Sequence, residues 1–303
     1  MIGEFEIALP HGVTLACRGN QAPPAFAAPA ARVLLVHGFP EAAFVWDEVL
    51  EALAPEVAGI APQMRGYAGS SAPAEPAAYR AKHLVADLAA LIERCGAPLD
   101  LLVAHDWGGA VAWALAAQRP HLLRQLLIVN SPHPATFLRE LKASEAQQRA
   151  SAYMTFLCRP DAEALLAEDD FRRLWRLFGA RAEPRWLSAA MKDRYRAVWR
   201  GGLNGPLNYY RASPLRPAQG PDDRLHELVL DDAAVTVRVP THVLWGEQDH
   251  ALLPGLLEGL ERWVPALTVE RVPEASHWIV HEQPARVAAT IRRLLARPAT
   301  GPA

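Results

Sequence analysis

The segment AHDWGG at residues 104–109 has small residues placed around a central acid, a pattern typical of a sharp turn from a strand into a helix. Such a turn would hold the side chain of Asp106 at its tip, beside the backbone N–H groups that open the helix. A carboxylate is already an anion at neutral pH, so it can attack carbon without a base to activate it. A lone Asp could be a simple helix N-cap, but the whole six-residue pattern favours a nucleophile.

A second turn, HGFP at residues 37–40, could bind the negative charge that such chemistry produces. Its glycine permits a tight bend, and its proline leaves the backbone N–H of Phe39 free. Alone, this turn is a common link between a strand and a helix. Together with the first turn it predicts an oxyanion hole made by the backbone N–H groups of Phe39 and Trp107. We expect His37 and His105 to hold the turns in place rather than to act as bases.

An acid and a base follow further along the chain. Asp249 lies in the segment WGEQDH after a predicted strand, and His277 lies in the segment SHW. The order nucleophile, acid, base is that of hydrolytic triads, in which the acid orients the imidazole and stabilises its positive charge. Glu247 is the rival acid, which we interpret as a solvated loop residue. Asn130 ends an earlier strand, but an amide cannot offset the charge of an imidazolium.

The sequence indicates neither a metal site nor a cofactor site. His277 and His281 are four residues apart, as in helical zinc pairs, but the H-E-x-x-H arrangement is absent and no further ligand is suggested. We expect His250 and His281 to lie at the surface or at the rim of a pocket.

Predicted strands place these residues at one edge of a sheet. Short, almost continuously apolar runs alternate with helical segments, as expected for parallel strands buried on both faces and joined by right-handed crossovers. Ligands bind beyond the carboxyl ends of such strands. The runs cover residues 32–37, 57–61, 100–104 and 125–130, helical segments include 81–95 and 110–118, and alternating patterns at 4–8 and 13–18 predict an antiparallel hairpin at the sheet edge.

A change in composition after residue 131 predicts an inserted helical unit. Strand-like runs disappear, and aromatic and basic residues fall into helical patterns at residues 171–178 and 185–200. We expect Trp175, Trp186 and Trp199 to pack this insertion. The prediction is an α/β fold with a mostly parallel, doubly wound sheet formed by residues 1–131 and 222–303, interrupted by a helical cap at residues 132–221. The second part contains predicted strands at 239–245 and 267–272 and helices near 254–263 and at 284–296.

These motifs together resemble the epoxide hydrolases of the α/β-hydrolase superfamily, over essentially the whole chain. The resemblance rests on HGFP, on RGYAGSS at residues 65–71, on AHDWGG, on Asp249, on SHW at 276–278 and on GPLNYYR at 205–211. It implies an α/β-hydrolase fold with a helical cap, an epoxide as the small-molecule substrate and no cofactor.

The resemblance also gives a role to tyrosines of the cap. It implies that Tyr210, and by a looser match Tyr153, donate hydrogen bonds to the oxygen of the epoxide ring. The match at Tyr153 is looser because Cys158 and Arg159 stand where the family often has Gln and Glu. Packing within the cap is the alternative for either residue, and it suits Tyr153 and Tyr209 better than Tyr210.

The chemistry of an epoxide suits this set of residues. Asp106 would attack a ring carbon and form an ester, while phenols, with an ordinary pKa of about 10, donate to the leaving oxygen without ionising near neutrality. His277, oriented by Asp249, would then activate the water that cleaves the ester to give a vicinal diol.

Two other classes of protein remain as alternatives. Haloalkane and haloacid dehalogenases share the Asp nucleophile, and the indole of Trp107 could donate to a halide. However, Phe39 stands where haloalkane dehalogenases commonly have a halide-binding Asn, and Trp107 stands where the haloacetate type has Arg. The absence of Ser from the turn disfavours a serine esterase. A hydrolase-fold binding protein without turnover is disfavoured by the intact set of Asp106, Asp249 and His277.

Composition limits the partners and the compartment. The 31 basic and 33 acidic residues give a net charge of -2, which does not favour nucleic acid as a partner. The three cysteines follow no ligand or disulfide pattern, and neither a signal peptide nor a membrane span is predicted, so we expect a cytoplasmic protein. Exposed aromatic residues of the cap leave a homodimer possible.

Overall fold

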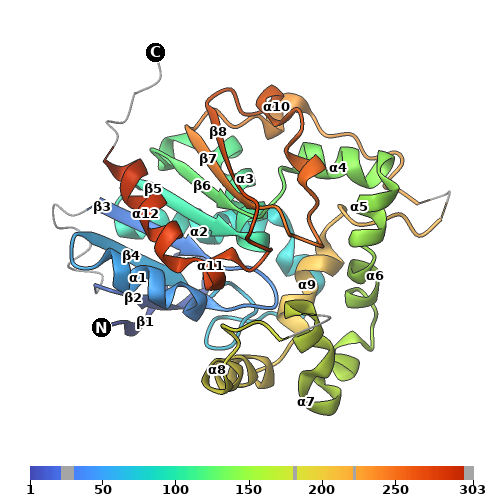
Figure 1. Ribbon diagram of the computed structural model, residues 1–303, viewed down its shortest axis with the longest axis horizontal. Coiled ribbons are helices and arrows are strands. Elements are labelled where there is room, and N and C mark those ends of the chain that lie inside the picture. The colour runs from blue at the N-terminus through green and yellow to red at the C-terminus, as the bar shows by residue number, and fades with distance from the viewer. Residues whose placement is uncertain (22–30, 180–182, 221–222, 297–303) are drawn as a thin grey trace.

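The structure is a computed structural model that describes residues 1–21, 31–179, 183–220 and 223–296. The described residues form an eight-stranded sheet in the order β1-β2-β4-β3-β5-β6-β7-β8 (Figure 1). Strands β3 to β8 pair in parallel, whereas β1 and β2 are antiparallel to each other and β2 is antiparallel to β4. The strands are β1 Gly3–Ala8, β2 Thr14–Gly19, β3 Ala31–Val36, β4 Val57–Pro62, β5 Leu101–His105, β6 Leu126–Val129, β7 Thr241–Gly246 and β8 Leu267–Val272. The predicted mostly parallel sheet and its edge hairpin are confirmed.

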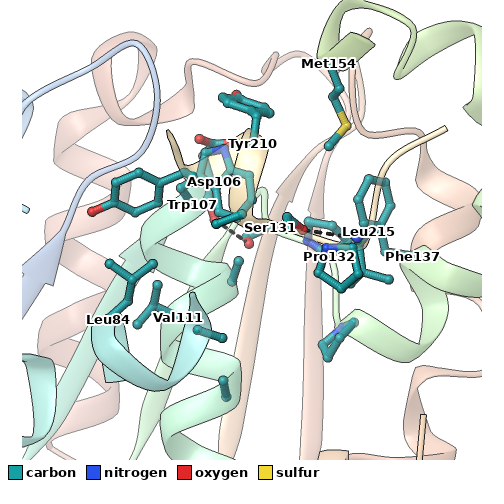
Figure 2. Close-up of a pocket in the computed structure, with 18 of the residues that line it drawn as sticks. Leu84, Asp106, Trp107, Val111, Ser131, Pro132, Phe137, Met154, Tyr210 and Leu215 are labelled. Atoms are coloured by element: carbon teal, nitrogen blue, oxygen red, sulfur yellow. Dashed lines mark hydrogen bonds between the residues drawn. The ribbon is translucent and has the colours of Figure 1, made fainter. Parts of the chain in front are cut away.

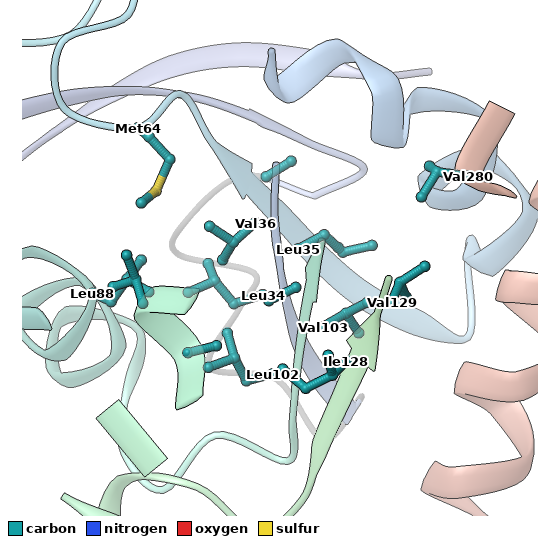
Figure 3. Packing of buried hydrophobic residues seen from close by; sticks show 14 of the residues in the cluster. Leu34, Leu35, Val36, Met64, Leu88, Leu102, Val103, Ile128, Val129 and Val280 are labelled. Carbon is teal, nitrogen blue, oxygen red and sulfur yellow. The ribbon is translucent and has the colours of Figure 1, made fainter. Parts of the chain in front are cut away.

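The central strands are buried along their whole length, which explains why apolar runs could predict them. Strands β4, β5, β6 and β7 expose almost nothing on either face, whereas β8, at the edge of the sheet, is mostly exposed or half-buried. Side chains of β3, β5 and β6, among them Leu34, Val103 and Ile128, fill the core of the sheet (Figure 3). Their burial supplies the apolar area that stabilises the fold.

Helices cover both faces of the sheet. On one face α1 Asp47–Leu53 packs against α12 Pro284–Leu295, next to α11 Ile279–Glu282. On the other face α2 Ala81–Cys95 packs against α3 Asp106–Gln118, which also contacts α10 Asp232–Val235. Short 3-10 helices are η2 Ala43–Trp46, η3 Pro76–Tyr79, η4 Pro120–Leu122, η5 Pro254–Leu257 and η6 Leu260–Arg262.

The predicted helix near residues 254–263 is wrong, because the segment forms two 3-10 turns. Pro254 opens the first turn, and Gly259 between the turns has a φ of 68°. A backbone in the left-handed region cannot continue a right-handed helix, so the apolar residues of this segment lie in two separate turns.

Six helices, α4 to α9, gather on one side of the molecule beyond the carboxyl ends of the strands (Figure 1). They are α4 Pro134–Ala143, α5 Glu145–Ala150, α6 Tyr153–Leu157, α7 Ala162–Phe178, α8 Ala189–Arg200 and α9 Asn204–Ala212. Helix α7 is kinked, with non-helical backbone angles from Glu168 to Phe171. The predicted boundary of the cap at residues 221–222, and most of the predicted loop at 21–31, lie outside the described residues.

An aromatic cluster joins α7 and α8, as the sequence predicts for packing inside the insertion. The rings of Trp175 and Trp199 lie 4.4 Å apart, and Phe178 contacts both Tyr195 and Trp199. Trp186 instead stacks on His281 of the core, with ring centroids 4.1 Å apart. The cluster therefore also fixes these helices to the sheet domain.

Candidate active site

Asp106 lies at the tip of a sharp turn between β5 and α3, with a φ of 50°. This left-handed backbone is strained for an Asp, and neighbouring glycines make room for it. A Cβ atom on Gly38 would lie only 2.3 Å from the Cβ of Asp106, and one on Gly108 would lie 2.6 Å from the carbonyl oxygen of His37. The small residues of the two turns are therefore required for their close approach.

The carboxylate of Asp106 is held at one of its two oxygens. The backbone N–H of Phe39 donates to Oδ1 at 2.7 Å, and the hydroxyl of Ser131 donates to the backbone carbonyl of Asp106 at 2.7 Å. Trp107 opens the first turn of α3, and no bond from its amide to this carboxylate occurs in the described part of the chain. Of the two predicted oxyanion donors, Phe39 is thus already in contact with Asp106.

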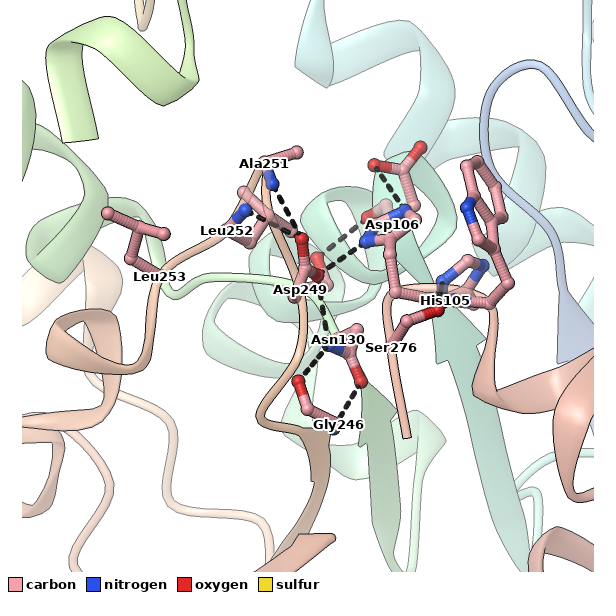
Figure 4. A network of polar contacts seen from close by, with 12 residues as sticks. His105, Asp106, Asn130, Gly246, Asp249, Ala251, Leu252, Leu253 and Ser276 are labelled. Carbon is pink, nitrogen blue, oxygen red and sulfur yellow. Dashed lines mark hydrogen bonds and ion pairs between the residues drawn. The ribbon is translucent and has the colours of Figure 1, made fainter. Parts of the chain in front are cut away.

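An imidazole and a second carboxylate lie beside Asp106. Nδ1 of His277 lies 2.6 Å from Oδ2 of Asp249, and Nε2 lies 3.8 Å from Oδ2 of Asp106. The other oxygen of Asp249 accepts from the backbone N–H groups of Ala251 and Leu252, each at 2.8 Å (Figure 4). Since every oxygen of Asp249 has a partner, its carboxylate is held in place against Nδ1 of His277.

Asn130 is not the acid that contacts His277, but it binds the carboxylate of Asp249. Its side-chain amide donates to Oδ2 of Asp249 at 2.9 Å and accepts from the backbone N–H of Gly246 at 2.8 Å. Glu247, the rival acid of the sequence analysis, instead pairs with Arg271 at 3.0 Å. The geometry therefore selects Asp249 as the partner of His277.

The charges around His277 favour its protonated form. Burial alone would lower the pKa of the imidazole, but the charge and hydrogen bond of Asp249, followed by the charges of Asp106 and Glu41, raise it to about 9. Burial likewise opposes ionisation of Asp249, yet the charge and the hydrogen bond of His277 keep the pKa of this carboxyl below its usual range. The resting site thus holds an imidazolium between two carboxylates.

Tyr153 and Tyr210 of the cap line two cavities beside Asp106, whereas Tyr209 lines one of these cavities and its hydroxyl is bonded away from Asp106. The rings of Tyr153 and Tyr210 lie 6.2 Å apart, and both residues line the two cavities that meet at Asp106. Burial raises the pKa of each phenol, and the charge of Asp106 acts in the same direction. Tyr209 donates its hydroxyl to the carbonyl of Arg65 at 2.8 Å and so serves packing, as the sequence favours.

Two cavities open on either side of the Asp106 carboxylate. The first, here called the Trp107 cavity, has a volume of about 240 Å³ and lies among apolar side chains such as Phe137, Met154 and Leu215 (Figure 2). The second, here called the His277 cavity, has a volume of about 670 Å³ and is lined by residues of α7, of the loop after β7 and of the loop after β8. A molecule that spans both would pass directly over Asp106.

A buried network behind the site was not found from the sequence. The fully buried Glu41 lies 2.8 Å from Nδ1 of His105 and 3.1 Å from Nε2 of His281. Nε2 of His105 lies 3.0 Å from the carbonyl of His277, and the hydroxyl of Tyr195 lies 2.7 Å from Nε2 of His281. The network joins α8 of the cap to the loop that carries His277.

One prediction about these histidines is wrong and another is confirmed. His281 was expected at the surface or at the rim of a pocket, but its side chain is only 3% exposed, because Glu41, Tyr195 and Trp186 enclose it, and it lines neither cavity. His37 and His105 do hold the turns, since Nε2 of His37 accepts the backbone N–H of Met64 at 3.1 Å. A buried Glu directly after HGFP is the signal that would have indicated a cationic partner.

The described ranges contain no cluster of three or more His, Cys, Asp or Glu side chains placed to hold a metal ion. No helix in those ranges is long and apolar enough to cross a membrane.

The parallel sheet, the strained turn at Asp106 and the Asp249–His277 pair define a hydrolase of the α/β type. A family model described as the alpha/beta hydrolase fold matches residues 31–284, and the chain belongs to this family. The chain is 35% identical over 84% of its length to AB hydrolase superfamily protein YfhM of Bacillus subtilis, of which it covers 86%. It is 32% identical over 83% of its length to mouse Epoxide hydrolase 4, of which it covers 69%.

A solved structure is similar over nearly the whole chain. It comes from a study of epoxide hydrolases of the α/β-hydrolase superfamily found in metagenomes from hot environments, with 32% identity and a TM-score of 0.86. The similarity covers 98% of this chain and 100% of that one.

Proposed function

We propose that the protein is an epoxide hydrolase, which adds water to an epoxide to give a vicinal diol. In the first step Oδ2 of Asp106 attacks a ring carbon, the carbon–oxygen bond of the ring breaks, and an ester forms on Asp106. Tyr153 and Tyr210, on the cap at residues 132–221, donate hydrogen bonds to the ring oxygen, and one phenol transfers its proton to this oxygen, which becomes the first hydroxyl of the diol. The phenolate that remains takes up the proton that His277 gives up, which leaves the imidazole neutral for the second step.

The second step hydrolyses the ester. Nε2 of His277 takes a proton from water, the water oxygen adds to Cγ of Asp106, and negative charge develops on Oδ1. The backbone N–H of Phe39, which lies 2.7 Å from Oδ1, supports this charge, and the amide of Trp107 is the second proposed donor. Collapse releases Oδ2 with the diol, whose second hydroxyl takes the remaining proton of the added water, and leaves the water oxygen in the carboxylate of Asp106.

Loss of charge on Asp106 links the two steps. In the resting site the Asp106 carboxylate helps to raise the pKa of His277 to about 9 and raises the pKa values of both phenols. The ester is neutral, so its formation lowers the pKa of His277 and of the tyrosines. The imidazole therefore gives up its proton more readily once the ester has formed, and the phenols become better proton donors as the charge on Asp106 is lost.

The single observation that carries the proposal is the placement of the Asp106 carboxylate in the wall of two cavities that Tyr153 and Tyr210 also line. Relatives whose names are epoxide hydrolase support the same reaction. The phenols suit a leaving oxygen that needs a proton, whereas a halide needs none.

The test is to incubate the enzyme with an aryl epoxide and to measure diol, using Asp106→Asn as the inactive control. Diol formed by the wild type alone supports the proposal. Release of chloride or bromide from haloalkanes, with epoxides left intact, would assign the site to the dehalogenases instead. Binding of an epoxide without any product would indicate a binding protein.

A further inference from the structure

The two cavities beside Asp106 differ in the charges that face them. In the Trp107 cavity Asp106 is the only charged residue among the described residues of the lining. The His277 cavity is lined in addition by Arg176, Gln248, His250 and Glu282. An occupant of the first cavity must be apolar beyond the reacting atoms, whereas an occupant of the second can carry a polar or charged group.

Arg176 is a cation without a partner among the residues that the structure describes. Its neighbours on α7 are paired, because Arg172 binds Asp169 and Arg173 binds Glu168 at 2.8 Å. Arg176 makes no ion pair or hydrogen bond with any described residue, and it is the member of this arginine group that lines the cavity. Its guanidinium therefore keeps all five N–H donors available for a ligand.

The carboxylates that face the same cavity already have hydrogen-bond or ion-pair partners. Glu282 accepts from the backbone N–H of Ser276 at 2.8 Å and from its hydroxyl at 2.5 Å. Asp249 and Asp106 flank His277, whose raised pKa of about 9 keeps the imidazole protonated near neutrality. An anion that enters this cavity thus meets the guanidinium of Arg176, which has no described partner, whereas each of the three carboxylates already has a hydrogen-bond or ion-pair partner.

We propose that the site prefers epoxides that carry an anionic group, such as a carboxylate, on one arm and an apolar group on the other. The apolar arm lies in the Trp107 cavity, the ring lies over Asp106, and the anionic arm extends through the His277 cavity to Arg176. This inference rests on the proposed function and names the substrate class of the same site. Arg176 is the specificity-determining residue, because its planar N–H fork matches a carboxylate.

The test compares epoxy carboxylic acids of increasing chain length with their methyl esters. For the best acid, Arg176→Gln should lower the ratio of kcat/KM for acid to that for ester by about threefold, the effect expected of a solvent-accessible ion pair. Arg176→Glu should lower it further, and added salt should reduce the ratio in the wild type only. Arg172→Gln, which removes a paired arginine from the same helix, is the matched control and should leave the ratio unchanged.

Binding is measured separately with alkenoic acids, in which a double bond replaces the epoxide ring. The acid should raise the Tm of the wild type more than its methyl ester does, and Arg176→Gln should abolish this difference. An acid-to-ester ratio and a Tm difference that are the same in Arg176→Gln, Arg172→Gln and the wild type would overturn the inference. If no epoxide is hydrolysed but the Tm difference still depends on Arg176, the proposed function fails and the anion site stands.

Discussion

Nε2 of His277 and Oδ2 of Asp106 are separated by 3.8 Å, and Oδ1 of the same carboxylate accepts the backbone N–H of Phe39. The distance is too long for a direct hydrogen bond, so Oδ2 is the oxygen to which the proposed mechanism assigns the attack. A water molecule that replaces the departing substrate arm could reach both the imidazole and Cγ. In the proposed mechanism Oδ2 attacks the epoxide and Oδ1 takes up the negative charge during ester hydrolysis, which gives the first prediction.

A single turnover in ¹⁸O water should label the enzyme and not the diol. Attack by Oδ2 transfers this oxygen to the product, and water then restores the carboxylate of Asp106. The measurement is the mass of the peptide that contains Asp106 together with the mass of the diol. A labelled diol from an unlabelled enzyme would mean that water attacks the epoxide directly.

Replacement of His277 by Gln should allow the first step and stop the second. Gln cannot accept the proton of water, so steady-state diol formation should fall by about 10²–10⁴-fold. Intact-protein mass spectrometry should then detect one added epoxide per chain. Asp106→Asn, which removes the nucleophile, is the control that gains no mass, and an unmodified His277→Gln enzyme with normal turnover would refute the role of the base.

The pKa of His277 should depend on the charge of Asp106. In the resting enzyme it is raised from 6.5 to about 9, so Asp106→Asn should lower it, and NMR titration of the imidazole measures the change. The raised pKa also sets the sign of a stability effect. Protonated His277 stabilises the fold fully below pH 6.5, and this contribution is lost as the pH rises towards about 9. A Tm that falls over this window in the wild type, but not in His277→Gln, confirms the linkage.

Adjacent tyrosines of α9 offer a matched pair of variants. Tyr210→Phe should slow ester formation about 10²-fold or more, because a phenol that protonates the ring oxygen is lost. Tyr209→Phe should leave ester formation nearly unchanged and lower the free energy of unfolding by about 1 kcal/mol, because its hydroxyl bonds only the carbonyl of Arg65. Stopped-flow measurement of Trp fluorescence follows the first step. Equal rates in the two variants would place the phenol of Tyr210 outside the reaction.

The sequence predicted those parts of the fold that depend on continuous burial or on local turns. Central strands such as β5 had to be apolar on both faces. The turn at Asp106 needed small neighbouring residues regardless of how the rest of the chain folds. Both are local requirements, so both are visible in a short segment. The prediction of a helix near residues 254–263 was wrong because it rested on apolar spacing alone, and Gly259 interrupts the helical backbone.

The sequence could not predict which side chains, far apart along the chain, lie in contact in the fold. Glu41 and His281 are 240 positions apart, and only the fold brings them together. Likewise, Asn130 directly follows β6 with a φ of 38° and directs its amide to Asp249, which no spacing rule predicts. The shapes of the two cavities depend on how α4 to α9 pack over the sheet, so they too required the structure.

The contact of α8 with the turn after Phe39 gives a last prediction. The indole N–H of Trp199 donates to the carbonyl of Pro40 at 2.8 Å in a buried position, next to the residue whose amide binds Oδ1 of Asp106. Trp199→Phe would leave this carbonyl unpaired, at a cost of about 1–3 kcal/mol in the free energy of unfolding. It should also loosen the turn and slow ester hydrolysis, with KM little changed. Trp175→Phe is the control, since Trp175 packs on Trp199 but its indole donates to the exposed carbonyl of Asp170. If both variants lose stability and neither slows hydrolysis, the cap only packs against the turn and does not position it.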